Sequence, residues 1–221
     1  MAELSIGKEE VSSSNLDVGS NPPVVTDYWN HNSAYHPWIL GVAREHRGSV
    51  LDVGCGEGLL LERLSPIASE VTGIDSDHAA IARARQRVAG LANVSVEETG
   101  FLEYAPKSAS YDLITFVASL HHLNLTAAIR KARSLLRPGG DLVVIGLSAN
   151  QTAADWALSG LQLPLVRLSG WMHRETRDIG VVAVPPRESL HEIRAVAERE
   201  LPGARIRRGL YYRYLLRWEE P

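Results

Sequence analysis

An apolar stretch that runs directly into a glycine-rich turn is the feature that most limits what this chain can fold into. Residues 50–58 read Val-Leu-Asp-Val-Gly-Cys-Gly-Glu-Gly, and a second apolar stretch, 71–74, ends in Asp75. Glycines at alternate positions let the backbone turn sharply and let a ligand approach it closely. Asp75 lies 21 positions beyond Gly54, where a carboxylate can hold both ribose hydroxyls of a nucleoside. The two features together predict a nucleoside site within a βαβ unit.

A dinucleotide-binding fingerprint differs from this turn at one position. Its third glycine would fall at residue 59, so that a helix N-terminus can meet a pyrophosphate. Residue 59 is Leu, and the glycine is Gly58. The turn therefore offers no evident phosphate site.

Four short blocks follow one another along the chain. They are Asp52-Val-Gly-Cys-Gly-Glu-Gly58, Gly73-Ile-Asp75, Tyr111-Asp-Leu-Ile-Thr-Phe116 and Leu135-Leu-Arg-Pro-Gly-Gly-Asp141. Together they resemble the ordered signature blocks of class I S-adenosylmethionine (SAM)-dependent methyltransferases, over residues 49 to 147. The end of the chain, Leu201-Pro-Gly-Ala-Arg205 and Leu210 to Trp218, resembles the closing strand pair of small bacterial members. A glycine turn alone would be less specific, because many α/β proteins use one to pass from strand to helix.

Strand-like and helix-like segments alternate through the middle of the chain. Strands are expected at 49–53, 70–74, 94–97, 111–116 and 142–147, and helices at 58–64, 77–88, 125–136 and 189–200. The segments 204–213 and 214–219 are expected to close the sheet as an antiparallel pair. This order predicts an α/β, Rossmann-like methyltransferase fold, with a mostly parallel seven-stranded sheet and helices on both faces.

The chain length favours one domain. A chain of 221 residues with 45% hydrophobic content can bury one sizeable core. We expect residues 1–23 to form a flexible tail and residues 24–221 a single methyltransferase domain. Its expected parts are an N-terminal lid (24–48), a SAM-binding core (49–147), a cap insertion (148–186) and a closing helix and strand pair (187–221).

The amino-acid composition limits the classes of binding partner that we expect. A net charge of −3 gives no global attraction to nucleic acid or to an anionic membrane, and Arg205, Arg207 and Arg208 fit a solvated edge strand. No apolar run approaches the roughly 18 residues of a membrane span, and no signal-peptide core is present. The single cysteine, Cys55, suits a reducing cytosol. We therefore expect a cytoplasmic protein with a small-molecule acceptor, without nucleic acid or membrane partners; the sequence leaves the oligomeric state open.

The resemblance also implies which residues hold SAM. Asp52 is expected near the ammonium group, Asp75 at the ribose hydroxyls and Ser76 at the adenine edge. Gly100 departs from the family pattern, which often has an acidic residue there, so adenine contacts would depend on Phe101 and backbone groups. The full expected cofactor set is Asp52, Gly54, Cys55, Gly56, Gly58, Asp75, Ser76, Gly100, Phe101, Val117, Ala118, Tyr28 and His36. We read Cys55 as a small packing residue within the turn.

Two adjacent histidines follow the fourth strand. An imidazole there can take a proton from a hydroxyl or a protonated amine near neutral pH, and we select His121 over His122 as the candidate base. Histidines at such junctions also commonly cap or pack. His31, His36 and His173 lack the spacing of metal ligands with a carboxylate partner, so no metal is expected.

The sequence thus favours SAM-dependent methyl transfer to an oxygen or nitrogen of a small organic molecule. Two other classes would keep the same cofactor residues. One is a SAM-binding enzyme of another reaction type, such as a cyclisation, and the other is a non-catalytic SAM-binding module.

Overall fold

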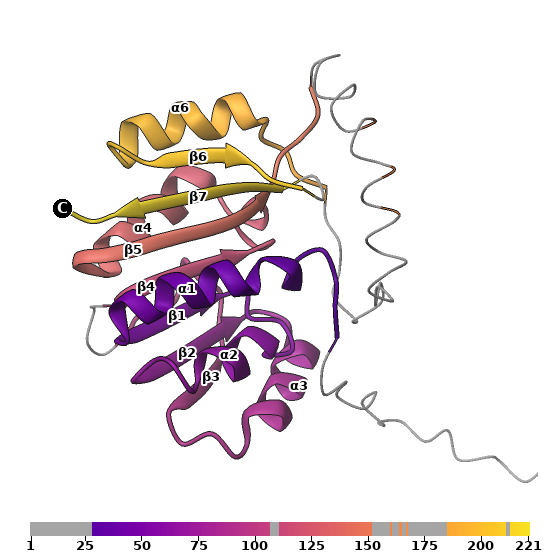
Figure 1. Ribbon diagram of the computed structural model, residues 1–221, viewed down its shortest axis with the longest axis vertical. Helices are drawn as coiled ribbons and strands as arrows, with labels where there is room; N and C mark the ends of the chain where they lie inside the picture. The colour runs from indigo at the N-terminus through magenta and orange to yellow at the C-terminus, as the bar shows by residue number, and fades with distance from the viewer. Residues whose placement is uncertain are drawn as a thin grey trace, which may run out of the picture.

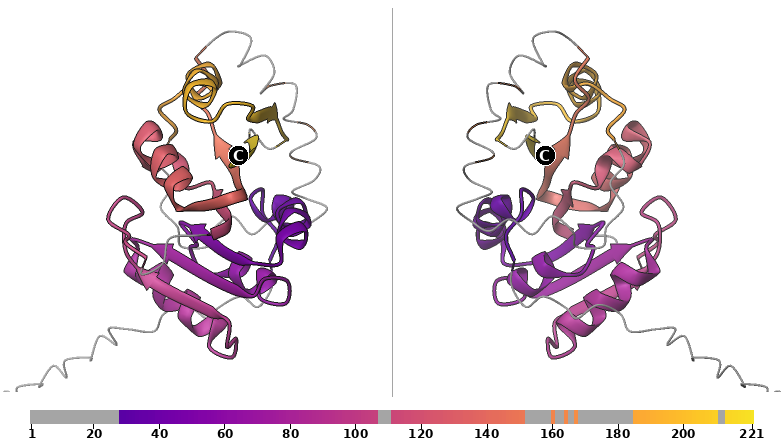
Figure 2. Two further views of the ribbon diagram at one scale, coloured as in Figure 1. Left: turned by 90° about the vertical axis from the view of Figure 1, so that its left-hand side faces the viewer. Right: turned by 90° about the vertical axis from the view of Figure 1, so that its right-hand side faces the viewer.

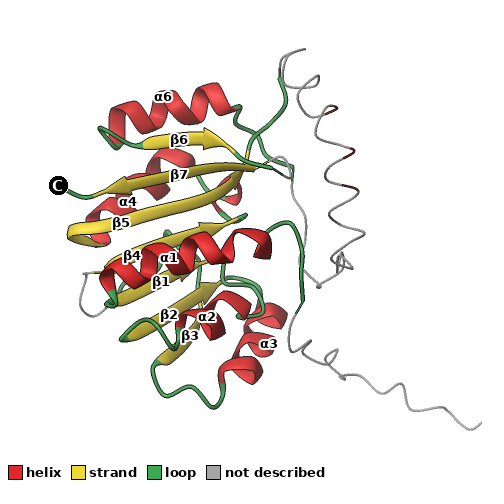
Figure 3. Ribbon diagram, viewed as in Figure 1, coloured by secondary structure: helices red, strands yellow, loops and turns green. Residues whose placement is uncertain are grey.

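A computed structural model describes residues 28–106, 111–151, 160, 164, 167, 185–210 and 213–221 of the protein. In this part of the chain a seven-stranded sheet is covered by helices (Figure 1, Figure 3). The strands are β1 (Ser49–Val53), β2 (Glu70–Asp75), β3 (Val94–Glu98), β4 (Tyr111–Val117), β5 (Leu136–Leu147), β6 (Arg205–Arg208) and β7 (Arg213–Glu219). The helices are η1 (Ser33–Tyr35), α1 (His36–His46), α2 (Leu59–Leu64), α3 (His78–Val88), η2 (Leu120–His122), α4 (Leu125–Leu135) and α6 (Leu190–Glu200). The predicted tail, 1–23, and most of the predicted cap insertion, 148–186, lie outside the described residues.

The sheet is mixed. Its order is β3-β2-β1-β4-β5-β7-β6, and the pairs among β1 to β5 are all parallel. The last strand, β7, lies between β5 and β6 and runs antiparallel to both. The prediction of seven strands and of an antiparallel closing pair is confirmed, while the sheet as a whole is not entirely parallel.

Two strand boundaries differ from the sequence prediction by more than one residue. The first closing strand ends at Arg208 instead of 213, because the chain turns at Gly209, whose amide donates to the Arg213 carbonyl at 2.7 Å. β5 begins at Leu136 instead of 142. Its pairing with β4 shifts register between Tyr111 and Leu113, so the Pro-Gly-Gly segment stays within the strand as an irregularity.

Alternation along the central strands creates two apolar layers. Residues 50, 113, 143 and 215 face a cluster that contains α1, α2 and α3, whereas 51, 114, 142 and 216 face a cluster that contains α4 and α6. Figure 2 shows α1 on one side of the sheet and α4 on the other. Ile39, Val42 and Ala43 of α1 are fully buried, so this helix contributes to the core. None of the helices described here is long and apolar enough to cross a membrane.

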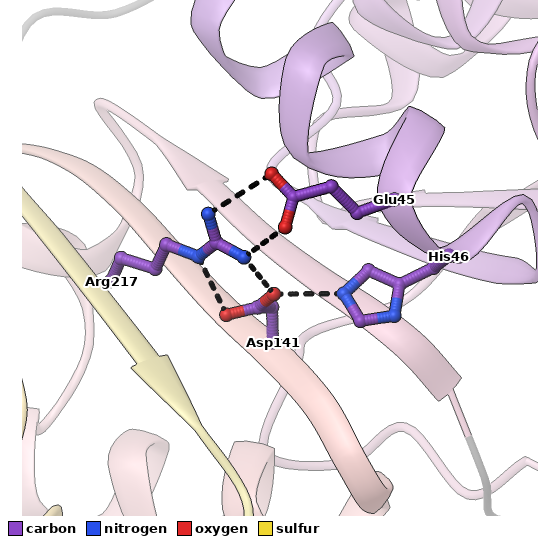
Figure 4. A network of polar contacts seen from close by, with 4 residues as sticks. All are labelled: Glu45, His46, Asp141 and Arg217. Atoms are coloured by element: carbon purple, nitrogen blue, oxygen red, sulfur yellow. Dashed lines mark hydrogen bonds and ion pairs between the residues drawn. The ribbon is translucent and has the colours of Figure 1, made fainter.

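A polar network fastens α1 to the sheet at its amino edge (Figure 4). Asp141 of β5 is almost fully buried, and Arg217 of β7 donates to both of its oxygens, at 2.9 and 2.8 Å. Arg217 also bonds to Glu45 at 2.6 Å, and the His46 ring contacts Asp141 at 2.8 Å. The Asp141 and Glu45 carboxylates hold the pKa of Arg217 above its usual range. α1, near the start of the described chain, and β7, near its end, are therefore joined through the buried carboxylate of Asp141.

Replacing Arg217 by methionine should destabilise the protein by about 3 kcal/mol, because it leaves the buried Asp141 charge without its main partner. Chemical unfolding at pH 7 measures this loss. Arg137→Met is the matched control: Arg137 is half exposed and pairs with Asp112, and loss of such a surface pair should cost under about 1 kcal/mol. Equal losses in the two variants would contradict the assigned importance of the buried network.

Candidate functional site

The glycine turn joins β1 to α2 at the carboxyl edge of the sheet. Gly54, Gly56 and Gly58 all have positive φ angles, of 73°, 56° and 85°. The amides of Gly54 and Cys55 both donate to the carbonyl of Ile74, at 2.8 and 3.0 Å. Because Ile74 precedes Asp75 at the end of β2, these bonds fix the turn beside that carboxylate.

The three glycines of the turn have different surroundings. A Cβ at Gly54 would lie 2.4 Å from the Cβ of Ser119, and one at Gly58 would lie 3.2 Å from Ala84 of α3. A Cβ at Gly56 would meet nothing within 4 Å. Gly54 and Gly58 therefore allow close packing within the protein, whereas Gly56 keeps one side of the turn open to a ligand.

Asp75 forms the other half of the site. Its Oδ2 accepts from the Gly56 amide at 2.9 Å, and its Oδ1 accepts from the Asp77 amide at 2.9 Å. An ionised carboxylate has about four acceptor positions, so each oxygen can still accept from a ribose hydroxyl. Ser76 is exposed beside it, and Asp77 caps α3 as predicted, through the amides of residues 79 and 80.

Asp52 is buried in β1, on the α1 side of the sheet. It is 2% exposed, and its Oδ1 accepts from the hydroxyl of Thr115, its register partner in β4, at 2.6 Å. Burial raises the pKa of Asp52 to about 7; the Thr115 bond opposes this rise, and the charge of Asp75 adds to it. A ligand cation placed here would favour the ionised form.

The carboxyl end of β4 contains a strained residue. After Val117, Ala118 has φ of 55°, a left-handed conformation that is uncommon for a residue other than glycine, and its amide donates to the Ile145 carbonyl at 2.7 Å. The next hydroxyl, of Ser119, donates to the carbonyl of Val53 at the end of β1. This bend links the two strand ends that flank the predicted site.

The bend leads directly into η2, which carries His121. The His121 ring is half-buried, and its centroid lies 4.2 Å from the centroid of the exposed His122 ring. His121, the candidate base, is therefore two residues beyond Ser119. Ser119 is the residue that packs against Gly54.

Three expected cofactor residues have side chains within the protein interior. Phe101 is 3% exposed and packs edge-on against Phe116, with centroids 5.2 Å apart, so its ring faces the core. Cys55 is buried, and burial raises the pKa of its thiol, which fits a packing role. His36 is buried at the start of α1, with Nδ1 2.9 Å from the Arg63 guanidinium of α2. Gly100 lies in the turn after β3, where the Thr99 amide donates to the Asp75 carbonyl at 2.9 Å.

Residues 28–35, which we call the strap, connect the glycine turn with the β6–β7 hairpin. At one end, burial, followed by the charge of Glu57, raises the pKa of the Tyr28 phenol. At the other, Arg213 donates twice to the Asn32 side-chain oxygen, at 3.1 and 2.7 Å, and the Tyr35 hydroxyl donates to the Leu210 carbonyl at 2.7 Å. Burial lowers the pKa of Arg213 to about 10. The strap and α1 both lie within the segment, 24–48, that the sequence predicted as a lid.

Sequence reasoning missed Glu57, Arg87 and Thr115. Thr115 could have been found, because it lies within an apolar strand, on the same side of the sheet as Asp52 of the neighbouring strand. Arg87 is in the last turn of α3, and nothing near it in the sequence signals that it reaches the glycine turn. Within the described ranges, no group of three or more His, Cys, Asp or Glu residues could hold a metal ion.

The residues present fit SAM, the cofactor that the family resemblance implies. The open side of Gly56 leaves room for a ligand, Asp75 retains acceptor positions for ribose hydroxyls, and Asp52 provides a buried carboxylate for an ammonium group. Each of these features is an observation on the protein alone.

Asp52 predicts a specific pH dependence of stability in the absence of cofactor. Its folded-state pKa, about 7, lies above the value near 3.9 of an unfolded chain, so its contribution is fully present below pH 4 and is lost as pH rises through 7. Relative to Asp52→Asn, which keeps the Thr115 bond, the wild type should lose on the order of 3 kcal/mol between pH 4 and pH 8. Urea unfolding of both proteins across this range measures the difference, and parallel stability curves would contradict the burial cost assigned to Asp52.

The chain resembles known methyltransferases in sequence. Residues 50–140 match the family model described as a methyltransferase domain. An uncharacterized methyltransferase of Mycobacterium tuberculosis is 32% identical over 201 residues, which cover 87% of this chain and 98% of that protein. The ubiquinone biosynthesis O-methyltransferase of Acinetobacter baylyi is 27% identical over 209 residues, 88% of this chain and 83% of that protein.

The fold resembles solved methyltransferases as well. The N-methyltransferase NodS from Bradyrhizobium japonicum, in complex with S-adenosyl-L-homocysteine, matches with a TM-score of 0.59 at 22% identity, over 87% of this chain and 89% of that one. This likeness supports the α/β Rossmann-like architecture. Since the mycobacterial relative is similar along almost its whole length, the chain belongs to the methyltransferase-domain family that its four sequence blocks indicated.

Proposed function

We propose that this enzyme transfers the methyl group of SAM to an oxygen or nitrogen atom of a small organic molecule in the cytoplasm. The observation that carries the proposal is the contact between Asp75 and the Gly56 amide, because it holds a carboxylate beside the open side of the glycine turn, where a ribose would bind. Solved relatives with bound S-adenosylhomocysteine and a curated relative named for O-methylation support it. A net charge of −3 argues against a nucleic-acid substrate.

The protein's part in such a reaction is binding, alignment and exclusion of water. When bound, SAM supplies an electrophilic methyl group on a sulfonium centre. Asp75 would hold the ribose hydroxyls, Asp52 would face the ammonium, and Val117 and Ala118 would contact the cofactor at the end of β4. His121 would take the proton from an acceptor that is protonated in its resting form.

Product analysis separates this proposal from its alternatives. Incubation with labelled SAM and a metabolite pool should yield S-adenosylhomocysteine together with a labelled small molecule. Release of methylthioadenosine would instead indicate another SAM-dependent reaction type. Tight SAM binding with no turnover on any acceptor would favour a non-catalytic module.

Asp75→Ala should weaken SAM binding by about 10- to 100-fold, since loss of charge-assisted hydrogen bonds costs roughly 1.5–3 kcal/mol. Calorimetric titration measures the change. Asp77→Ala is the control, because Asp77 caps α3 in the same loop; it should lower stability by about 1 kcal/mol and leave the affinity near that of the wild type. Unchanged affinity in folded Asp75→Ala would mean that the ribose is held elsewhere.

His121→Ala should lower kcat by about 10²- to 10⁴-fold with nearly unchanged SAM affinity, if the imidazole removes a proton from the acceptor. Single-turnover methylation across pH gives the rate once an acceptor is known. His122→Ala removes the exposed neighbouring ring and should retain the wild-type rate. A wild-type rate and pH profile in His121→Ala would remove this residue from the mechanism.

A further inference from the structure

We propose that Arg87 of α3 is a positioning residue for the cofactor: it holds the glycine turn at the spacing from Asp75 at which both can contact one ribose. The inference rests on the proposed function, since it concerns the same cofactor site. Arg87 lies outside the cofactor set that the sequence predicted. Its action is indirect, because it runs through the main chain of the turn.

The glycine turn contains one buried charged residue, Glu57. It stands between Gly56 and Gly58 and is 6% exposed. Burial of a carboxylate is costly unless the group is paired and hydrogen-bonded. Glycine allows many backbone conformations, so a fixed residue between two glycines restricts the path of the turn.

Arg87 contacts both the side chain and the main chain of Glu57. Its Nη2 donates to Glu57 Oε1 at 3.0 Å, and its Nε donates to the Glu57 carbonyl at 3.2 Å. Both side chains are buried, with exposures of 2% for Arg87 and 7% for Glu57. The carbonyl bond bears directly on the turn, because it fixes the peptide group that joins Glu57 to Gly58.

A second residue of α3 packs against the same part of the turn. A Cβ at Gly58 would lie 3.2 Å from Ala84, so the helix and the turn are in close contact there. Ala84 and Arg87 are three positions apart, so they lie on one face of the helix. The second half of the turn therefore rests on α3 at two consecutive residues, Glu57 and Gly58.

The other end of α3 is attached to Asp75. The amide of Asp77, the N-cap residue of this helix, donates to Asp75 Oδ1 at 2.9 Å. Asp75 Oδ2 accepts from the Gly56 amide, also at 2.9 Å. These contacts form a closed ring, which runs from Asp75 along α3 to Arg87, into the turn, and back to Asp75 through Gly56.

The two halves of the turn are held by different partners. Two amides of the first half bond to the Ile74 carbonyl, whereas the second half contacts α3. Gly56, the residue with the open side, lies between these two anchors. Without the Arg87 anchor, the Gly56 amide should bond less firmly to Asp75. A ligand would then have to order the turn as it binds, and this cost lowers affinity.

The affinity for S-adenosylhomocysteine, measured by calorimetric titration on the full chain, tests this inference. Arg87→Met keeps a long side chain without the guanidinium and should raise Kd by about 5- to 30-fold. In an Asp75→Ala background the same substitution should raise Kd by less than about twofold, because the contact that Arg87 maintains is already absent. A purely structural role of Arg87 would give the same fold-change in both backgrounds.

Hydrogen exchange of the Gly56 amide in the ligand-free protein gives a second readout. Its rate should rise by about 5- to 30-fold in Arg87→Met, because the bond to Asp75 opens more often. If Arg87→Met fails to fold, Arg87→Lys decides. Lysine keeps a positive charge beside Glu57 but lacks the planar guanidinium that spans its carboxylate and carbonyl, so Kd should rise by about 3- to 10-fold.

Glu62→Gln is the matched control. Glu62 is a second carboxylate partner of Arg87, at 2.9 Å, but it belongs to α2 and its side chain is 43% exposed. Its replacement leaves both contacts between Arg87 and Glu57 in place. The Kd and the Gly56 exchange rate should therefore stay within twofold of the wild type.

Three results would overturn the inference. One is a Kd within twofold of the wild type in the folded Arg87 variants, and another is an equal fold-change in the presence and absence of the Asp75 side chain. The third is an equal loss of affinity in Glu62→Gln. Failure of the proposed function is distinct from all three, since the wild type itself would then bind neither SAM nor S-adenosylhomocysteine.

Discussion

The bond from the Gly56 amide to the Asp75 carboxylate is the interaction on which the site depends. It connects a turn that follows β1 to a side chain at the end of β2, and it requires a backbone conformation that glycine adopts without strain. The amides of Gly54 and Cys55, which both donate to the Ile74 carbonyl, also fix the position of the turn. Asp75 is therefore oriented by the backbone before a ligand arrives, which reduces the ordering that binding would require.

Stability and function are separated between the two edges of the sheet. At the amino edge, the buried Asp141 has a guanidinium partner and stabilises the junction of α1 with β5 and β7. At the carboxyl edge, Asp52 is buried with a hydroxyl partner and a raised pKa, and Ala118 has a left-handed backbone. These latter features cost free energy in the absence of a ligand. Such costs are typical of binding sites, because the stability of the rest of the fold compensates for groups that are fully stabilised only when a ligand binds.

Much of this arrangement could be predicted from the sequence. The glycine turn, Asp75 and the helix cap at Asp77 are local signals, because each depends on residues a few positions apart. The positions of most strands and helices along the chain follow from alternation of apolar segments, and the antiparallel closing pair was also predictable. The start of β5 was not, because the Pro-Gly-Gly segment resembles a turn but lies within the strand, where the register with β4 shifts.

The rest of the site depends on contacts between distant segments. Arg87 reaches Glu57 across 30 positions, and Asn32 meets Arg213 across 181. Nothing in the local pattern distinguishes these residues from solvated charges on a helix or strand. Phe101, which the family resemblance placed near adenine beside Gly100, packs its ring against Phe116 in the core, and this packing also depends on distant segments.

A crystal structure of the protein with S-adenosylhomocysteine would show directly where the ribose binds. Both ribose hydroxyls should lie within about 3.2 Å of the Asp75 carboxylate oxygens, with the ligand against the open side of Gly56. A ligand bound away from the turn, or a ribose held by other residues while Asp75 keeps only its backbone bonds, would contradict this placement of the ribose.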